Sequence, residues 1–164
     1  MNIGGIIHES LNDGIGVRTV IFISGCKHDC NGCHNMRLSN FGYGKPFGTE
    51  MQNYILEYVE NDKLIDGITI SGGDPIYSSN ELLEFVKKFK EKFKTKTIWL
   101  YTGFKFEDIK ELEILNYIDV LVDGEFQLEL RNITIPFRGS ENQRLIDVKK
   151  TSETNGIVLY DENY

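Results

Sequence analysis

The chain has 164 residues, of which 40% are hydrophobic and 26% charged, a composition that fits one globular domain and excludes a disordered segment. Its net charge of −7 argues against nucleic acid as the main partner, because phosphate contacts need a surplus of cations. No apolar run approaches the roughly 18 residues of a membrane span, and residues 1–10 lack the pattern of a signal peptide. We therefore expect a cytoplasmic protein with no membrane partner.

Strand and helix patterns alternate along the chain. Short apolar runs predict four strands, at 17–23, 68–70, 97–101 and 120–122. Helical spacing between these runs predicts three helices, which start near Thr49, start near Ser78 or Ser79, and cover 106–115. Single helices between strands favour right-handed crossovers and a mostly parallel sheet. A closed eight-stranded barrel needs about 200 to 250 residues, so we expect a single α/β domain over 1–164 with a partial, open barrel.

The C-terminal segment has a different pattern. Residues 144–149 and 157–160 are two further candidate strands, and Asn155-Gly156 is a turn signal between them. The sequence thus predicts a C-terminal hairpin within 144–164.

The only three cysteines, Cys26, Cys30 and Cys33, lie in one glycine-containing loop with the spacing C-x3-C-x2-C. An odd, clustered set of thiols in a reducing compartment is a poor disulfide framework and a good ligand set for a soft metal. Three thiolates can hold three irons of a cubane cluster and leave the fourth iron without a protein ligand.

Three other interpretations of this loop are open at the level of residues. The cysteines with His28 or His34 could form a tetrahedral zinc site. Residues 30–34 match the C-x-x-C-H pattern of haem attachment, although that chemistry usually follows export. The thiols could also have no ligand at all.

Polar and glycine-rich segments follow the predicted strands at their carboxyl ends, where parallel sheets bind ligands. Ser71-Gly72-Gly73-Asp74-Pro75 follows the second strand, Tyr101 ends the third, and Asp123-Gly124 ends the fourth. The glycines allow close approach to a ligand, although Gly-Asp-Pro is also an ordinary turn sequence. Arg18, in an apolar strand, is either a buried cation that needs an anionic partner or a surface residue.

The cysteine loop resembles that of the radical S-adenosylmethionine superfamily. Together with its flanking motifs, the chain is similar over 6–143 to the activating proteins of anaerobic ribonucleoside-triphosphate reductases. The segments that carry this resemblance are Asp13-Gly14-Ile15-Gly16-Val17-Arg18, Phe22-Ile23-Ser24-Gly25-Cys26, Cys30-Asn31-Gly32-Cys33, Ser71-Gly72-Gly73-Asp74-Pro75, Tyr101-Thr102-Gly103-Phe104, Leu121-Val122-Asp123-Gly124-Glu125-Phe126 and Arg138-Gly139-Ser140-Glu141-Asn142-Gln143.

The resemblance implies a radical S-adenosylmethionine fold and a [4Fe–4S] cluster held by Cys26, Cys30 and Cys33. It implies that the reduced cluster cleaves S-adenosylmethionine to a 5′-deoxyadenosyl radical, which takes a hydrogen atom from a glycine of the reductase. It also implies an electron donor such as a flavodoxin-type protein. The residues expected to contact the cofactors are Arg18, Gly32, Cys33, His34, Gly72, Gly73, Asp74, Tyr101 and Asp123.

Two other functions compete with this interpretation. One is a radical enzyme that acts on a different glycyl radical enzyme or on a small molecule, and the other is a zinc-stabilised interaction module without catalysis. The polar segment Arg138–Gln143 is expected at the rim of the open side, where a protein substrate would enter.

Overall fold

Four parallel strands form the centre of a seven-stranded sheet in the computed structural model, which describes residues 1–154 and 156–161. The strand order is β3-β1-β2-β4-β5-β6-β7, and the neighbours from β2 to β6 pair in parallel. The outer pairs, β3 with β1, β1 with β2, and β6 with β7, are antiparallel. The strands are β1 Asn2–Ser10, β2 Val17–Ile23, β3 Lys45–Pro46, β4 Ile65–Gly72, β5 Thr97–Tyr101, β6 Val120–Asp123 and β7 Arg144–Asp147.

The central strands are nearly continuous apolar runs because both of their faces are covered. Their register brings four strand ends to one edge of the sheet: Ile23 pairs with Gly72, and Tyr101 pairs with Val122. The cysteine loop leaves the sheet at this edge, directly after β2. The polar segments expected at strand ends are therefore neighbours in space.

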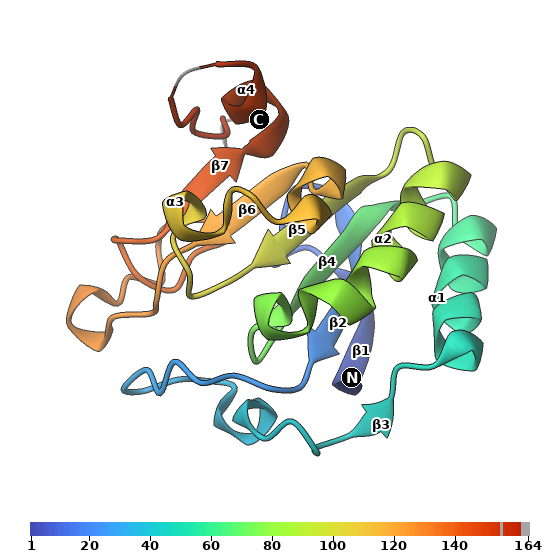
Figure 1. Ribbon diagram of the computed structural model, residues 1–164, viewed down its shortest axis with the longest axis horizontal. Coiled ribbons are helices and arrows are strands. Elements are labelled where there is room, and N and C mark those ends of the chain that lie inside the picture. The colour runs from blue at the N-terminus through green and yellow to red at the C-terminus, as the bar shows by residue number, and fades with distance from the viewer. Residues whose placement is uncertain (155, 162–164) are drawn as a thin grey trace.

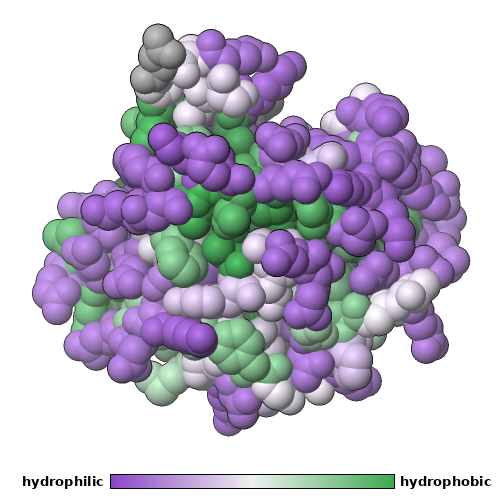
Figure 2. Space-filling model, in the orientation of Figure 1, coloured by the Kyte–Doolittle hydropathy of each residue, from purple (hydrophilic) through white to green (hydrophobic). Residues whose placement is uncertain are grey.

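Helices α1 (Thr49–Asn61) and α2 (Ser79–Lys92) cover one face of the sheet, which faces the viewer in Figure 1. Each helix buries an apolar stripe at helical spacing, with Ile55 and Val59 in α1 and Phe85 and Phe89 in α2. These side chains join the main hydrophobic core. Figure 2 shows the same face with hydrophobic surface in its middle, bordered by hydrophilic side chains.

The second face of the sheet packs against loops. A smaller core of Trp99, Val120, Val122 and Leu145 lies on this face and contacts Ile15, Phe137 and Tyr160, all of which come from loop segments. The two edge strands, β3 and β7, do not pair with each other, so the sheet is open. The predicted α/β class and open sheet are confirmed. Within the described residues, no helix has the length and apolar character needed to span a membrane.

Two elements differ from the sequence-based expectation. Strand β1 was not predicted, because Gly4-Gly5 interrupts its apolar pattern, and it pairs antiparallel with β2. The helix predicted over 106–115 is two short pieces, α3 (Phe106–Ile109) and the 3₁₀ helix η3 (Glu113–Tyr117). Leu112 has extended backbone angles and separates the two pieces.

The C-terminal segment is part of the main sheet rather than a separate hairpin. β7 pairs with β6 along its whole length, and helix α4 (Val148–Glu153) begins where the predicted strand over 144–149 was expected to continue. The chain then returns antiparallel to β7, with a bridge between Ile146 and Leu159. Asp147 N–H donates to Val158 O (2.9 Å) and Tyr160 N–H donates to Leu145 O (2.8 Å), so part of the expected pairing within 144–160 is present. Asn155 of the predicted turn lies outside the described residues.

Candidate functional site

A cavity of about 420 Å³ lies at the carboxyl ends of the central strands. Segments far apart in the sequence form its walls: the cysteine loop, the ends of β4, β5 and β6, and the loop from Arg131 to Gln143. The residues that line it are Cys26, His28, Cys30, Cys33, His34, Asn35, Ser71, Gly72, Gly73, Tyr101, Thr102, Gly103, Gly124, Phe126, Arg131, Asn132, Ile133, Arg138, Gly139 and Gln143.

All three cysteines face this cavity as free, half-buried thiols. Backbone hydrogen bonds hold the start of their loop, since Gly25 N–H donates to Leu38 O (2.7 Å) and Cys26 N–H donates to Ser39 O (3.1 Å). Burial raises the pKa of the Cys26 and Cys30 thiols. Binding of iron would reverse this preference, because a metal ion stabilises the thiolate it coordinates.

The cysteine loop fits an iron–sulfur cluster better than a single ion. In the described part of the chain, no group of three or more Cys, His, Asp or Glu side chains is spaced to hold one metal ion. A cubane cluster does not need its protein ligands to converge on one point, because each thiolate binds a different iron atom. Three thiols on one cavity wall, with the opposite wall formed by other segments, match this ligand arrangement.

Gly72 and Gly73 at the end of β4 pack directly against the cysteine loop. Gly73 N–H donates to Ile23 O (2.7 Å), and a Cβ atom on Gly73 would lie 2.6 Å from Gly25 O. Gly72 has φ +117°, and its carbonyl accepts from Asn35 Nδ2 (3.0 Å). Glycine is required at both positions because side chains would force the two backbones apart.

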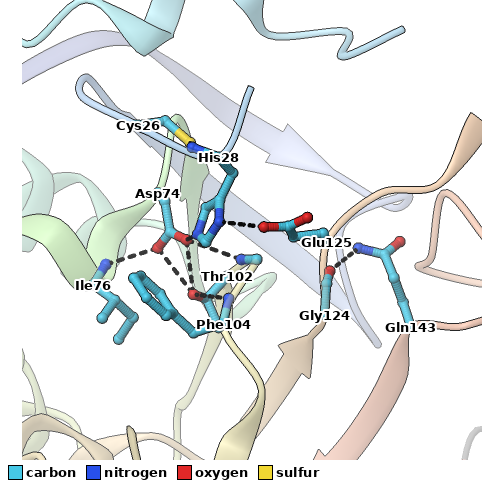
Figure 3. A network of polar contacts seen from close by, with 10 residues as sticks. Cys26, His28, Asp74, Ile76, Thr102, Phe104, Gly124, Glu125 and Gln143 are labelled. Atoms are coloured by element: carbon cyan, nitrogen blue, oxygen red, sulfur yellow. Dashed lines mark hydrogen bonds and ion pairs between the residues drawn. The ribbon is translucent and has the colours of Figure 1, made fainter. Parts of the chain in front are cut away.

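Asp74 holds three segments together through a fully buried carboxylate (Figure 3). It accepts from Ile76 N–H (2.9 Å), which caps the 3₁₀ helix η2 (Pro75–Ser78). It also accepts from the Thr102 hydroxyl (2.9 Å) and Gly103 N–H (2.9 Å), at the end of β5. Asp74 was predicted to contact the cofactor, and the structure shows its oxygens occupied by donors of the protein itself.

His28 links the cysteine loop to this carboxylate. Its Nε2 lies 2.7 Å from Asp74 Oδ2, and its Nδ1 lies 2.8 Å from Glu125 Oε1, beyond the end of β6. The hydrogen bond to Asp74, and to a lesser extent the one to Glu125, raises the pKa of His28. The imidazolium form donates to both carboxylates. The ring packs against Phe104 and Tyr77, and its side chain is only 9% exposed.

The structure corrects the role expected for Arg18. Arg18 lies near the start of β2, opposite Gly67, at the far end of the strands from the cysteines. Its five N–H groups donate to oxygens of the protein interior, namely the hydroxyls of Thr69 and Thr97 and the carbonyls of Ile15, Ile68 and Thr97. Burial lowers its pKa to about 10. Arg18 therefore has no N–H group left for a cofactor, and it fixes strands to one another.

The role expected for Asp123 is also corrected. Its buried carboxylate accepts from Phe106 N–H (2.7 Å) and from Arg144 Nε (2.9 Å), and it does not line the cavity. The next residue, Gly124, lines the cavity instead, and its carbonyl accepts from Gln143 Nε2 (2.9 Å). The contacts with Phe106 and Arg144 hold the Asp123 side chain away from the cavity, and the backbone of Gly124, directly after β6, lines it.

The other predicted residues divide into two groups. Cys33, His34 and Tyr101 line the cavity, and the Tyr101 hydroxyl donates to Phe137 O (2.9 Å). Gly32 is exposed and does not line it; its φ of +75° lets the loop turn between the last two cysteines.

Residues that the sequence analysis missed come mainly from the loop after η4 (Leu128–Leu130). Arg131, Asn132 and Ile133 line the cavity opposite the cysteines, together with Phe126. Phe126 ends the motif Leu121–Phe126, but no motif marks Arg131, Asn132 or Ile133. Pairing of this segment with residues 139–141 holds it at the site, and such a contact leaves no local sequence pattern. Arg138 and Gln143, expected at the rim, do line the cavity.

Comparisons with known proteins agree with this geometry. Residues 12–146 match the family model described as a 4Fe-4S single cluster domain. The chain is 39% identical over 163 residues to the anaerobic ribonucleoside-triphosphate reductase-activating protein of Enterobacteria phage T4, covering 98% of this chain and all of that protein. Proteins with the same name match 80% of this chain from Pasteurella multocida (38% identical, 87% of that protein) and Escherichia coli K12 (34%, 88%). The chain therefore belongs to the family of anaerobic ribonucleoside-triphosphate reductase-activating proteins.

Proposed function

We propose that this protein activates an anaerobic ribonucleoside-triphosphate reductase by radical chemistry that uses a [4Fe–4S] cluster and S-adenosylmethionine. The three cysteine thiols and the glycine turn at Gly72-Gly73 line the same cavity, and this observation carries the proposal. The family of the chain supports it, because its relatives are named as activating proteins of that reductase and its family model describes a single 4Fe-4S cluster.

Each wall of the cavity has a distinct task in this proposal. Cys26, Cys30 and Cys33 hold three irons and leave the fourth for S-adenosylmethionine. The backbone of Gly72 and Gly73 allows the methionine end to approach closely, and Tyr101 on the same cavity contacts the nucleoside end. When bound, the two cofactors supply a one-electron cleavage whose product removes a hydrogen atom from a glycine of the reductase.

The open sheet supports a protein substrate. We assign the fold to the partial-barrel type of radical S-adenosylmethionine proteins, with its open side at the cavity. A glycine within another protein can reach the cofactors only if this side is not closed by the chain's own helices. The polar rim from Arg138 to Gln143 is the surface proposed to contact the reductase.

The zinc alternative with His28 as the fourth ligand is disfavoured by the surroundings of that side chain. Both of its ring nitrogens already face carboxylates, so neither is free to complete a Cys3His site. The family model further separates the alternatives, because it describes an iron–sulfur domain rather than a zinc or haem domain.

The test is anaerobic reconstitution with iron and sulfide, followed by addition of S-adenosylmethionine and a strong reductant. We expect about four irons and four sulfides per chain, and release of methionine. A colourless protein that holds one zinc and releases no methionine would reject the proposal. Cys30→Ala should lose both the cluster and methionine release, whereas the neighbouring change Asn31→Ala removes no thiol and should retain both. Cleavage by Cys30→Ala at the unmodified rate would show that the ligand assignment is wrong.

A further inference from the structure

Hydrogen bonds fasten the cysteine loop to the end of β4 at its start, its middle and its end. At the start, Asp74 N–H donates to Gly25 O (2.8 Å). In the middle, His28 Nε2 lies 2.7 Å from Asp74 Oδ2 (Figure 3). At the end, Asn35 Nδ2 donates to Gly72 O (3.0 Å).

The bond at the end of the loop is made by one side chain. Within the part of the chain that the structure describes, no other hydrogen bond joins residues 30–35 to residues 71–73. Asn35 follows Cys33 by two positions, and both line the cysteine cavity together with Gly72. Asn35 therefore connects the third thiol to the glycine turn.

The peptide group between Gly72 and Gly73 is held at both of its polar atoms. Its N–H, from Gly73, donates to Ile23 O (2.7 Å), and its carbonyl, from Gly72, accepts from Asn35. A peptide group flanked by two glycines rotates freely, because neither residue has a Cβ atom that restricts it. Gly72 also lies at φ +117°, where other residues are strained. Hydrogen bonds, rather than side-chain sterics, therefore fix which way this peptide group faces.

The Asn35 amide has one favourable orientation in this wall. Its Nδ2 donates to Gly72 O, and the reverse orientation would place two oxygen atoms 3.0 Å apart. The backbone of Asn35 is held as well, because Leu38 N–H donates to Asn35 O (2.7 Å) at the start of the 3₁₀ helix η1 (Met36–Ser39). On its outer side, Asn35 borders a second surface hollow of about 620 Å³. The residue is thus part of the partition between this hollow and the cysteine cavity.

Resting on the proposed function, we infer that Asn35 is a positioning residue for S-adenosylmethionine. It acts through the peptide group between Gly72 and Gly73, which is the backbone that the methionine end approaches, and it fixes this group relative to Cys33. Without the Asn35 donor the carbonyl is free to rotate, so cofactor binding has to order it again. The three thiols are retained in such a variant. The expected result is weaker cofactor binding with a normal cluster content.

The experiment compares Asn35→Asp with Asn31→Asp, the same change at an exposed position between Cys30 and Cys33. Aspartate keeps the shape of asparagine but has no N–H group to donate, and both variants add the same charge to the same loop. Each protein is reconstituted to about four irons, and binding of S-adenosylmethionine is measured by equilibrium dialysis with no reductant present. We expect Asn35→Asp to bind the cofactor about tenfold more weakly than the unmodified protein, and Asn31→Asp to bind it as the unmodified protein does.

Asn35→Leu separates the lost hydrogen bond from the added charge. Leucine has a similar size, donates no hydrogen bond and carries no charge, so this variant should also bind the cofactor about tenfold more weakly. Iron content is measured on every variant and should equal that of the unmodified protein.

Hydrogen exchange at the glycine turn distinguishes failure of this inference from failure of the proposed function. Gly73 N–H is protected by Ile23 O, and freeing the peptide group should raise its exchange rate in both Asn35 variants but not in Asn31→Asp. If the unmodified protein holds a cluster but binds no S-adenosylmethionine, the proposed function is wrong, and the exchange rates alone decide the positioning role. The inference is overturned if both Asn35 variants bind the cofactor as the control does, exchange Gly73 N–H as the control does, or fail to assemble the cluster.

Discussion

His28 shows how one side chain can fix a metal-binding loop that has few contacts of its own. It lies between Cys26 and Cys30, and its two ring nitrogens reach Asp74 after β4 and Glu125 after β6. Its neighbours Lys27 and Asp29 are exposed, and Asp29 lies in the left-handed region at φ +45°. The imidazole therefore joins the cysteine ligands to the same strand ends that form the rest of the cavity.

We predict that His28→Ala assembles a cluster but holds it less firmly. Hydrogen bonds to charged groups are worth about 1.5–3 kcal/mol each, and one of them alone corresponds to a factor of about ten. Iron loss to a chelator should therefore be at least about tenfold faster. The measurement is the rate of bleaching after addition of the chelator under anaerobic conditions. His8→Ala is the control, because His8 makes its 2.7 Å hydrogen bond to Tyr54 on α1, away from the cavity. Equal rates for both variants would contradict a positioning role for His28.

At the level of residues, the sequence predicted only part of the cavity lining. The cysteines and the glycines at 72 and 73 line the cavity as expected, since their type and spacing restrict what they can do. Arg18 and Asp123 were assigned to the cofactor because buried charges need partners, but the partner of a charge is a long-range contact. Arg18 is satisfied by interior carbonyls and hydroxyls, and Asp123 is paired with Arg144.

Among the elements, β7 is held to the sheet by a charged contact as well as by strand pairing. Arg144 donates to the buried Asp123 on β6 and, at 2.8 Å and 3.0 Å, to Glu107 on α3. This contact lowers the pKa of Glu107 to about 2 from its usual 4.5. Because the pKa is depressed on folding, the stabilisation is present above pH 4.5 and is lost as the pH falls towards 2.

Arg144→Met should lower the free energy of unfolding at neutral pH by about 3 kcal/mol, because it leaves the Asp123 carboxylate buried without its cation. The measurement is anaerobic denaturant unfolding, followed by circular dichroism. Lys150→Met is the matched control, since Lys150 pairs with Asp147 at an exposed position and should contribute about 0.5 kcal/mol or less. A loss for Arg144→Met no larger than that of the control would show that β7 is held by backbone pairing alone.

Elements that a local apolar pattern specifies were predicted correctly. Elements that depend on pairing with a strand far away in the sequence were not. The expected strand at 17–23 and the expected start of α1 at Thr49 agree with the structure because apolar spacing alone specifies them. The antiparallel strands β1 and β7 depend on partners elsewhere in the chain. No local signal places β7 beside β6, and this pairing was not predicted. The expected pairing of 144–149 with 157–160 is present in part, as the bridge between Ile146 and Leu159 and its neighbouring backbone hydrogen bonds.

The whole molecule combines an acidic chain with an open sheet. Helices protect only one face of the sheet, and the other face packs against loops that lead to the cysteine cavity. His34 and Asn35, directly after the cysteines, line both this cavity and a separate surface hollow. In our account, the reductase approaches the cavity from its open side.

The most direct test of the account is electron paramagnetic resonance of an anaerobic ribonucleoside-triphosphate reductase mixed with this protein. The mixture contains S-adenosylmethionine and a reductant, and oxygen is excluded throughout. We predict a glycyl radical signal from the reductase that requires S-adenosylmethionine and is absent when Cys30→Ala replaces the unmodified protein. Methionine release by a cluster-containing protein with no radical on the reductase would contradict the account.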